Sequence, residues 1–276
     1  MATIAVGQMR VEPGKVDANL GTMLALIAEA SGRGAELVVL PELALTGLID
    51  DMQAVVQQIP GATTEKLCEA ARDGGIWTVA GMPEANPAGG PFNAAVVISP
   101  AGEIAAVYRK IFLYLQEAEG FACGREACLP DLGFARVGLT ICYDYIFPEY
   151  LRRLVLGGAE LLLHPTAWVD TQACRDWHYP AAEAYRAQCL VRALENQVFF
   201  ASANIIGPWD AGGWLEGVGR SSIIAPWGEV LAEVANDEGD GQGLAVADLD
   251  FDRVAQWCEQ VAPYMRDFRA KTIPEV

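Results

Sequence analysis

Short apolar runs alternate with amphipathic segments along almost the whole of this chain. Strand-like runs, many rich in branched residues, occur at 3–9, 36–40, 76–80, 94–99, 103–109, 137–141, 160–164 and 197–204. Helix-like segments occur between several of them, at 16–30, 63–75, 148–158 and 177–196. This alternation predicts a mixed sheet covered by helices. Because one open sheet of so many strands would be very wide, we expect two packed sheets.

The chain is long for one simple core but within the size range of one large α/β domain. It has 276 residues, 52% of them hydrophobic, and no linker or short-period repeat divides it. A chain of this size and composition can bury a sizeable core. We therefore expect a single domain over residues 1–276.

Charge and hydropathy disfavour several kinds of partner. The formal net charge of −17 argues against nucleic acid and anionic membranes, which attract basic proteins. No apolar run is long enough for a transmembrane helix, and the N-terminal segment MATIAVGQMR lacks the layout of a signal peptide. We therefore expect a cytoplasmic protein that binds neither nucleic acid nor membrane.

The cysteines and histidines indicate neither a disulfide framework nor a metal centre. There are seven cysteines, an odd number at scattered spacings, and no CxxC pair. Cys174 and His178 are four residues apart, and His164 is the only other histidine. Because this is too few ligands for a structural zinc site, we expect no metal and no cofactor.

Three reactive side chains each follow an apolar strand-like run. Glu42 follows ELVVLP, Lys110 follows EIAAVYR, and Cys142 follows RVGLTI. The carboxyl ends of strands are where α/β sheets generally bind ligands. A carboxylate could take the thiol proton, the thiolate could attack a carbonyl or nitrile carbon, and the ammonium could face the developing oxyanion. Each residue could equally lie in an ordinary loop, because spacing alone does not bring the three together.

The segment that contains Cys142 predicts a strand, a tight turn and a helix. The run 137–141 suits a buried strand, and Pro148 and Glu149 suit the first turn of a helix. A thiol at such a turn points out of the backbone and can shift toward thiolate. A buried structural cysteine in a strand is the commoner fate of a lone cysteine.

Several motifs, in order along nearly the whole chain, resemble the nitrilase, or carbon–nitrogen hydrolase, superfamily. The similar segments are PELALTG, YRKIFLYLQEAEGF, GLTICYDYIFPE, AELLLHPTAW, VRALENQVFFASANIIG and GRSSIIAPWGEVL. The resemblance implies a four-layer α-β-β-α sandwich. It also implies homodimers or higher homo-oligomers, with residues 261–276 as a C-terminal arm that crosses onto a partner subunit.

The resemblance implies a thiol hydrolase of non-peptide C–N bonds. Its catalytic triad falls on Glu42, Lys110 and Cys142. A second glutamate that orients substrate or assists proton transfer falls on Glu117, with Glu119 as the alternative.

Three further positions follow from the same resemblance. The backbone N–H of Tyr143 is the expected second oxyanion donor, and Trp168 is expected to line the acyl pocket. An aromatic residue at position 168 could equally belong to the core. Glu149 is interpreted as support behind the site or as a simple helix cap.

Two departures from the family pattern make the surroundings of the site more apolar. Leu48 stands where the family often has Tyr, and Phe112 stands where it often has His. Cys-Tyr-Asp at 142–144 is similar to the amidase and omega-amidase branches, whereas nitrilases tend to have Cys-Trp-Glu. We therefore expect an amidase that acts on a small, neutral or weakly polar primary amide and releases ammonia from a thioester intermediate.

Four alternatives remain open at this point. The first is an N-carbamoyl amidohydrolase, whose paired arginines would fall on Tyr145 and Ile146, so that Arg125 or Arg175 would have to bind the carboxylate. The others are a nitrilase, an inactive binding module on the same fold, and a Cys–His hydrolase that uses one of the two histidines.

Overall fold

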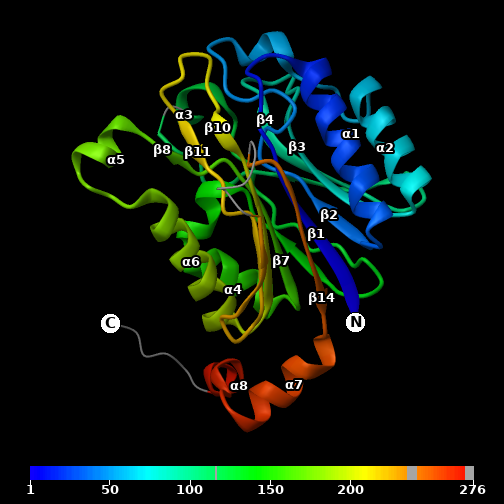
Figure 1. Ribbon diagram of the computed structural model, residues 1–276, viewed down its shortest axis with the longest axis vertical. Helices are drawn as coiled ribbons and strands as arrows, with labels where there is room; N and C mark the ends of the chain where they lie inside the picture. The colour runs from blue at the N-terminus through cyan, green and yellow to red at the C-terminus, as the bar shows by residue number, and fades with distance from the viewer. Residues whose placement is uncertain (116, 235–240, 271–276) are drawn as a thin grey trace.

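The computed structural model describes residues 1–115, 117–234 and 241–270. Two β-sheets face each other, and helices cover the outer face of each, which gives the expected α-β-β-α layers (Figure 1). The strands of the first sheet, in spatial order, are β14 (Gly243–Leu249), β1 (Ala2–Gln8), β2 (Leu37–Val39), β3 (Trp77–Glu84), β4 (Phe92–Ile98) and β5 (Ile104–Arg109).

The second sheet faces the first, and a small third sheet lies beside them. The strands of the second sheet are β13 (Val230–Glu233), β12 (Ser222–Ile224), β9 (Phe199–Asn204), β7 (Leu161–Thr166) and β6 (Val137–Leu139). Those of the third are β10 (Ile206–Pro208), β11 (Glu216–Val218) and β8 (Val169–Asp170).

Helices cover the sheets on the outside. The helices are α1 (Val16–Gly32), α2 (Ala62–Gly74), α3 (Glu117–Gly120), α4 (Pro148–Leu156), α5 (Gln172–Asp176), α6 (Ala181–Asn196), α7 (Phe251–Gln260) and α8 (Tyr264–Arg269). Two 3₁₀ turns, Met52–Val55 and Cys142–Ile146, complete the set. α1 and α2 lie beside the first sheet, whereas α4 and α6 lie beside the second (Figure 1). None of the helices in the described part of the chain is both long and apolar enough to span a membrane.

Strand direction brings the ends of distant segments to one edge of the first sheet. β1, β2 and β3 are mutually parallel, and β4 and β5 then reverse direction twice. The carboxyl ends of β2 and β5 and the amino end of β4 therefore lie on the same side. These ends lead to Glu42 and Lys110 and contain Asn93.

Apolar side chains fill two separate layers. Between the sheets, Val6 and Val39 of the first sheet belong to the same cluster as Leu139 and Leu163 of the second, and all four are fully buried. Outside the first sheet, a second cluster joins it to α1 and α2. Burial of a Val or Leu side chain contributes roughly 1.5–3 kcal/mol, so these layers stabilise the packing of the two sheets that carry the site.

The long helix predicted over 177–196 begins only at Ala181. The residues before it form the short α5 and an irregular segment in which Trp177 is 85% exposed. Pro180 explains the break, because proline disfavours helical backbone in the residue that precedes it.

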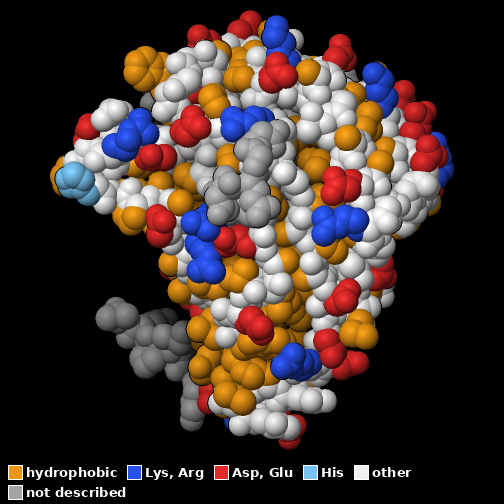
Figure 2. Space-filling view, in the orientation of Figure 1, with side chains coloured by type: hydrophobic (Ala, Val, Ile, Leu, Met, Phe, Trp, Pro, Cys, Tyr) orange, Lys and Arg blue, Asp and Glu red, His pale blue; other side chains and the backbone are white. Residues whose placement is uncertain are grey.

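At the carboxyl end, α7 and α8 extend from the lower end of the sheets (Figure 1). Hydrophobic side chains gather in this region in Figure 2. Met265 of α8 donates its N–H to Gln197 Oε1 of the same chain at 2.7 Å. Residues 271–276 of the predicted arm lie outside the described residues, and its contact with a partner subunit stays a prediction.

Candidate active site

Glu42 and Lys110 meet at the shared sheet edge, together with Glu117 of α3 and Asn93 of β4. Lys110 Nζ donates to Glu42 Oε1 at 2.7 Å and to Glu117 Oε2 at 2.6 Å. Asn93 Nδ2 donates to Glu42 Oε1 at 2.7 Å and to Glu117 Oε1 at 2.9 Å. The four side chains thus form a closed ring in which an ammonium and an amide each bridge the same two carboxylates. We call these four residues the carboxylate ring.

Backbone N–H groups fix the ring from outside. The N–H of Ala167, just after β7 of the second sheet, donates to Glu42 Oε2 at 2.8 Å. The N–H of Tyr114 donates to Glu117 Oε2 at 2.9 Å. Buried carboxylates need donors on their oxygens, and here each receives three. The two sheets and α3 therefore all take part in positioning the ring.

A glycine allows the Glu42 turn to approach the sheet. A Cβ on Gly81 of β3 would lie 2.2 Å from Pro41 O and 2.8 Å from the Cα of Glu42. Leu43, which follows Glu42, has a φ of 42°, a left-handed conformation that non-glycine residues rarely adopt. Such strain persists only where the surrounding structure enforces it, and it is concentrated at functional sites.

The charges of the ring depend on one another. Burial alone would lower the pKa of Lys110, but Glu42 and Glu117 raise it well above its usual value, so Lys110 is an ammonium. Burial raises the pKa of Glu42, and the charge of Lys110 opposes this without reversing it. A carboxyl group with a raised pKa is a better proton acceptor than an ordinary glutamate, and it can later return the proton.

Cys142 lies beside this ring at the start of the 3₁₀ turn. Its φ is 45°, and it is only 8% exposed. Burial and then the charge of Glu42 raise the pKa of the Cys142 thiol, whereas Lys110 and the Thr166 hydroxyl oppose the rise. The resting thiol is therefore neutral. The sequence suggested a shift toward thiolate, and that expectation is wrong for the resting protein because burial outweighs the nearby ammonium.

Asp144 connects the segment that contains Lys110 with the turn that contains Cys142. It accepts hydrogen bonds from the Tyr108 hydroxyl at 2.7 Å, from the Phe112 N–H at 2.8 Å and from the Ile141 N–H at 2.8 Å. Burial raises the pKa of Asp144 to about 6. In the sequence, Asp144 served only to distinguish amidase-like from nitrilase-like members of the family. Its place two residues after the cysteine was the signal that could have indicated a structural role.

The structure distinguishes the two candidate second glutamates. Glu117 is buried in the ring, whereas Glu119, two residues on, is exposed. Glu149 is also exposed, in the first turn of α4, where its charge complements the helix dipole. Among the described residues, no hydrogen bond joins Glu149 to the ring.

Tyr143 directly follows Cys142 in the chain, whereas Trp168, expected to line the acyl pocket, is not among the residues that line the cavity described below. Tyr143 follows Cys142 in the first turn of the 3₁₀ segment, where N–H groups have no acceptor within the helix. Its ring packs edge-on against Tyr114, with centroids 5.0 Å apart. Trp168 is half-buried, and its ring packs edge-on against Tyr145 at 5.2 Å.

Leu48 and Phe112, the two apolar residues that depart from the family pattern, lie in different surroundings. Leu48 lines a cavity beside the ring, as described below. Phe112 stacks on Phe147 with centroids 3.9 Å apart, and it is not among the residues that line this cavity.

The two histidines are poorly placed to act as bases. His164 is fully buried, its Nδ1 is 2.9 Å from Thr140 Oγ1, and burial lowers its pKa to about 3. His178 is exposed in the segment after α5. Glu42 is therefore the better candidate base.

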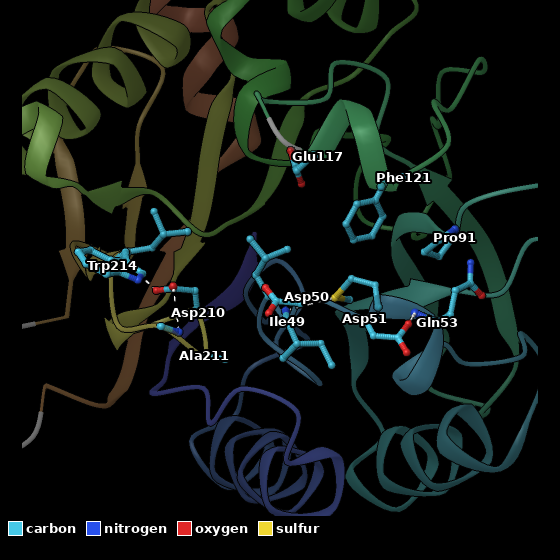
Figure 3. Close-up of a pocket in the computed structure, with 15 residues that line it drawn as sticks. Ile49, Asp50, Asp51, Gln53, Pro91, Glu117, Phe121, Asp210, Ala211 and Trp214 are labelled. Carbon is cyan, nitrogen blue, oxygen red and sulfur yellow. Dashed lines mark hydrogen bonds between the residues drawn. The ribbon is translucent and has the colours of Figure 1, made fainter.

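A cavity of about 590 Å³ opens beside Glu117 (Figure 3). The Glu117 side chain points toward it, and Asp51 and Asp210 lie on its other sides. The lining is mostly apolar: Leu48, Ile49, Met52, Pro91, Phe121, Trp214 and Leu215 contribute to it. Of the residues that the structure describes, no Lys or Arg lines this space.

Neither arginine considered as a carboxylate clamp reaches this cavity. Arg175 is 3.1 Å from Asp170 in an exposed ion pair, and Arg125 is exposed. Tyr145, at one of the positions where a paired arginine would stand, is fully buried. In the part of the chain that the structure describes, no group of three His, Cys, Asp or Glu could hold a metal ion.

The fold and the site together define a hydrolase of the nitrilase superfamily. The family model described as carbon-nitrogen hydrolase matches residues 3–259, so the chain belongs to the carbon–nitrogen hydrolase family. It is an enzyme of the amidase-like kind.

The individual relatives include a nitrilase as well as amidases. The chain is 38% identical over 256 residues to a nitrilase from Pyrococcus abyssi, covering 91% of this chain and 90% of that one. It is 31% identical to an omega-amidase from Danio rerio, covering 94% and 91%. Among solved structures, the NitN amidase from a Nesterenkonia species is similar with a TM-score of 0.78 and 29% identity, covering 97% of this chain and 100% of that one.

Proposed function

We propose that this enzyme hydrolyses small primary amides to a carboxylic acid and ammonia through a thioester on Cys142. The observation that carries the proposal is the buried carboxylate ring next to a neutral, buried thiol. A neutral thiol is a weak nucleophile and needs a base, and Glu42 is an adjacent carboxylate with a raised pKa.

In the first half of the reaction, Glu42 takes the thiol proton while Cys142 Sγ bonds to the amide carbonyl carbon. Lys110 and the N–H of Tyr143 stabilise the negative charge on the carbonyl oxygen. The C–N bond then breaks, and Glu42 returns the proton to the leaving nitrogen, which departs as ammonia.

In the second half, water attacks the thioester carbon and gives a proton to Glu42. The C–S bond breaks, the acid leaves, and the proton returns to Cys142 Sγ. Glu117 keeps Lys110 in place and borders the cavity, so we assign it the orientation of the substrate amide rather than the main proton transfer.

Of Glu42, Lys110, Glu117 and Cys142, only Glu117 lines the cavity, and through it we assign the cavity to the acyl group of the substrate. A neutral substrate fits this cavity better than a carboxylate-bearing one. The lining is mainly apolar, its charged members Asp50, Asp51, Glu117 and Asp210 are all acidic, and the described residues supply no cation. An unpaired substrate carboxylate would be penalised there, whereas each buried methylene contributes roughly 0.8 kcal/mol. Two mutants of the Nesterenkonia amidase have been solved, one in complex with butyramide and the other with the acetamide moiety of fluoroacetamide on its active-site cysteine, which also supports the proposal.

The experiment is to compare kcat/KM for an amide, a nitrile and an N-carbamoyl amino acid of matched carbon skeleton. We expect the amide to be preferred, with kcat/KM rising with apolar acyl size until the cavity is full. The nitrile is the second candidate, because a relative at 38% identity is named a nitrilase. A clear preference for the N-carbamoyl amino acid would overturn the argument from the cavity and point to Arg125 or Arg175 as the clamp.

A further inference from the structure

Asn93 is the one member of the carboxylate ring that bears no charge. It lies at the start of β4, is fully buried, and donates through a single nitrogen to both Glu42 and Glu117. Its side-chain oxygen, Oδ1, is buried and has no hydrogen-bond partner among the described residues. Buried polar groups normally have hydrogen-bond partners, and this amide leaves its acceptor unpaired while its donor bonds to two carboxylates. A purely structural role explains this arrangement poorly.

The fold does not need this side chain to join its strands. The backbone carbonyl of Asn93 already accepts the Lys110 N–H at 2.8 Å, and Asn93 also pairs with Pro83 in the ladder between β3 and β4. These contacts are made by the backbone and do not involve the side chain at position 93. The amide group is therefore available for a role in the site.

The charge balance of the ring shows why a neutral donor is suited to this place. Glu42 faces Lys110 from the loop after β5, Glu117 from α3 and Cys142 from the 3₁₀ turn. One ammonium thus serves two carboxylates. Without the amide bridge, Lys110 alone would oppose the repulsion that Glu117 exerts on the charged form of Glu42. A second cation would also oppose this repulsion but would make Glu42 too weak a base for the thiol.

We propose that Asn93 is a positioning residue that holds the side chains of Glu42 and Glu117 in fixed, separate places and favours the carboxylate form of Glu42, so that Glu42 is ready to accept the Cys142 proton. Hydrogen bonds to the charged form of a carboxylate favour that form. Loss of the amide would let Glu42 keep a proton to higher pH, and the acid would then be unable to act as a base. This inference rests on the proposed amidase chemistry and adds the residue that sets its working pH.

The test replaces Asn93 by leucine, which has a similar size but no donor and no unpaired oxygen. The matched control is Asn196→Leu. Asn196 is also buried with an unpaired Oδ1, but its amide nitrogen donates to Arg192 O and Glu195 Oε1, both within α6. The measured quantities are the pH profile of kcat/KM for a primary amide and the thermal midpoint.

We expect Asn93→Leu to lower kcat/KM at pH 7 by about tenfold or more, within the range of proton-transfer effects. The acid limb should move to higher pH, with a thermal midpoint close to that of the wild type. Asn196→Leu should leave the profile in place. An unmoved acid limb in Asn93→Leu would overturn the proposal.

A second readout separates this inference from the proposed function. Iodoacetamide alkylates a thiol when Sγ bonds to the methylene carbon, iodide leaves and the thiol proton passes to a base. The rate at Cys142, followed by peptide mass, should show the same shift of its acid limb in Asn93→Leu. If no amide is turned over but this shift is present, the amidase proposal fails and the role of Asn93 stands. An unshifted alkylation profile would overturn the role of Asn93.

A second variant covers the case in which leucine is not tolerated. Asn93→Ser keeps one hydroxyl donor, which can serve only one carboxylate, so its acid limb should lie above that of the wild type. If both variants fail to fold, the side chain is structural and the proposal is rejected.

Discussion

At the scale of single residues, the main feature of the site is that its buried charges are paired with one another. Glu42, Glu117 and Lys110 are almost fully buried, and each has partners at 2.6–2.9 Å. Cys142 lies among them as a thiol whose pKa is raised by burial. Reactivity must therefore come from proton transfer to Glu42 during attack rather than from a thiolate formed in advance.

We predict that Glu42→Gln lowers kcat/KM by at least about a hundredfold, because an amide cannot accept the thiol proton. Glu119→Gln is the control, since Glu119 is an exposed glutamate two residues from the ring member Glu117. It should keep nearly full activity. Near-normal turnover by Glu42→Gln would assign the base to another residue.

The pH profile of kcat/KM of the wild-type enzyme also tests whether Glu42 is the base. Burial raises the pKa of Glu42 above its ordinary value of 4.5, and the base must be deprotonated in the free enzyme. Activity should therefore fall as pH decreases through this raised pKa, so the acid limb of kcat/KM should lie above pH 4.5. A limb at or below pH 4.5 would contradict the assignment of Glu42.

At the scale of elements, the site depends on turns that follow strands. Among the non-glycine residues with positive φ, three lie beside the site: Leu43 after Glu42, Leu115 before Glu117, and Cys142 itself. Asp144 stabilises two of the segments involved, because its three donors come from β5, from the loop after it and from the strand end before Cys142.

We predict that Asp144→Ala lowers the free energy of unfolding by at least about 3 kcal/mol, since it leaves two buried donors and one half-buried donor without an acceptor. Asp250→Ala is the control, because Asp250 is a half-buried cap of α7 and its loss should cost about 1 kcal/mol. Chemical denaturation measures both. A loss no larger than that of the control would show that Asp144 is not needed to hold the turn.

The pH dependence of this effect has a definite sign. Burial raises the pKa of Asp144 from 3.8 to about 6, so the folded protein holds this proton more tightly than the unfolded chain. Its contribution to stability therefore falls as pH rises through that window. The difference in unfolding free energy between wild type and Asp144→Ala should be larger at pH 4 than at pH 7.

The sequence predicted the strand ends well and the contacts around them less well. Apolar runs ended close to Glu42, Lys110 and Cys142 because buried strands leave a clear pattern. Asn93 was missed, although one polar residue in the apolar run FNAAVVI was a visible signal. Its role depends on which carboxylates it meets, and that is set by the packing of β4 beside β5 and the turn after β2.

At the scale of the whole molecule, two sheets are needed to build one site. The first sheet supplies Glu42, Lys110 and Asn93, and the second supplies Cys142 and the N–H of Ala167. Alternating elements predicted two sheets, and the family resemblance supplied their four-layer order, which the structure confirms. The cavity could not be predicted, because its walls come from segments as distant as 48–53 and 210–215. Assembly into homo-oligomers stays a prediction.

The central claim is that an amide is cleaved through a thioester on Cys142. The most direct measurement is the mass of the protein quenched in acid during turnover of a primary amide, with peptide mapping of the modified residue. We expect the acyl mass on Cys142, with ammonia released, and neither signal from Cys142→Ala that retains the wild-type fold. Acyl mass on another cysteine, or ammonia release at the wild-type rate by Cys142→Ala, would contradict the mechanism.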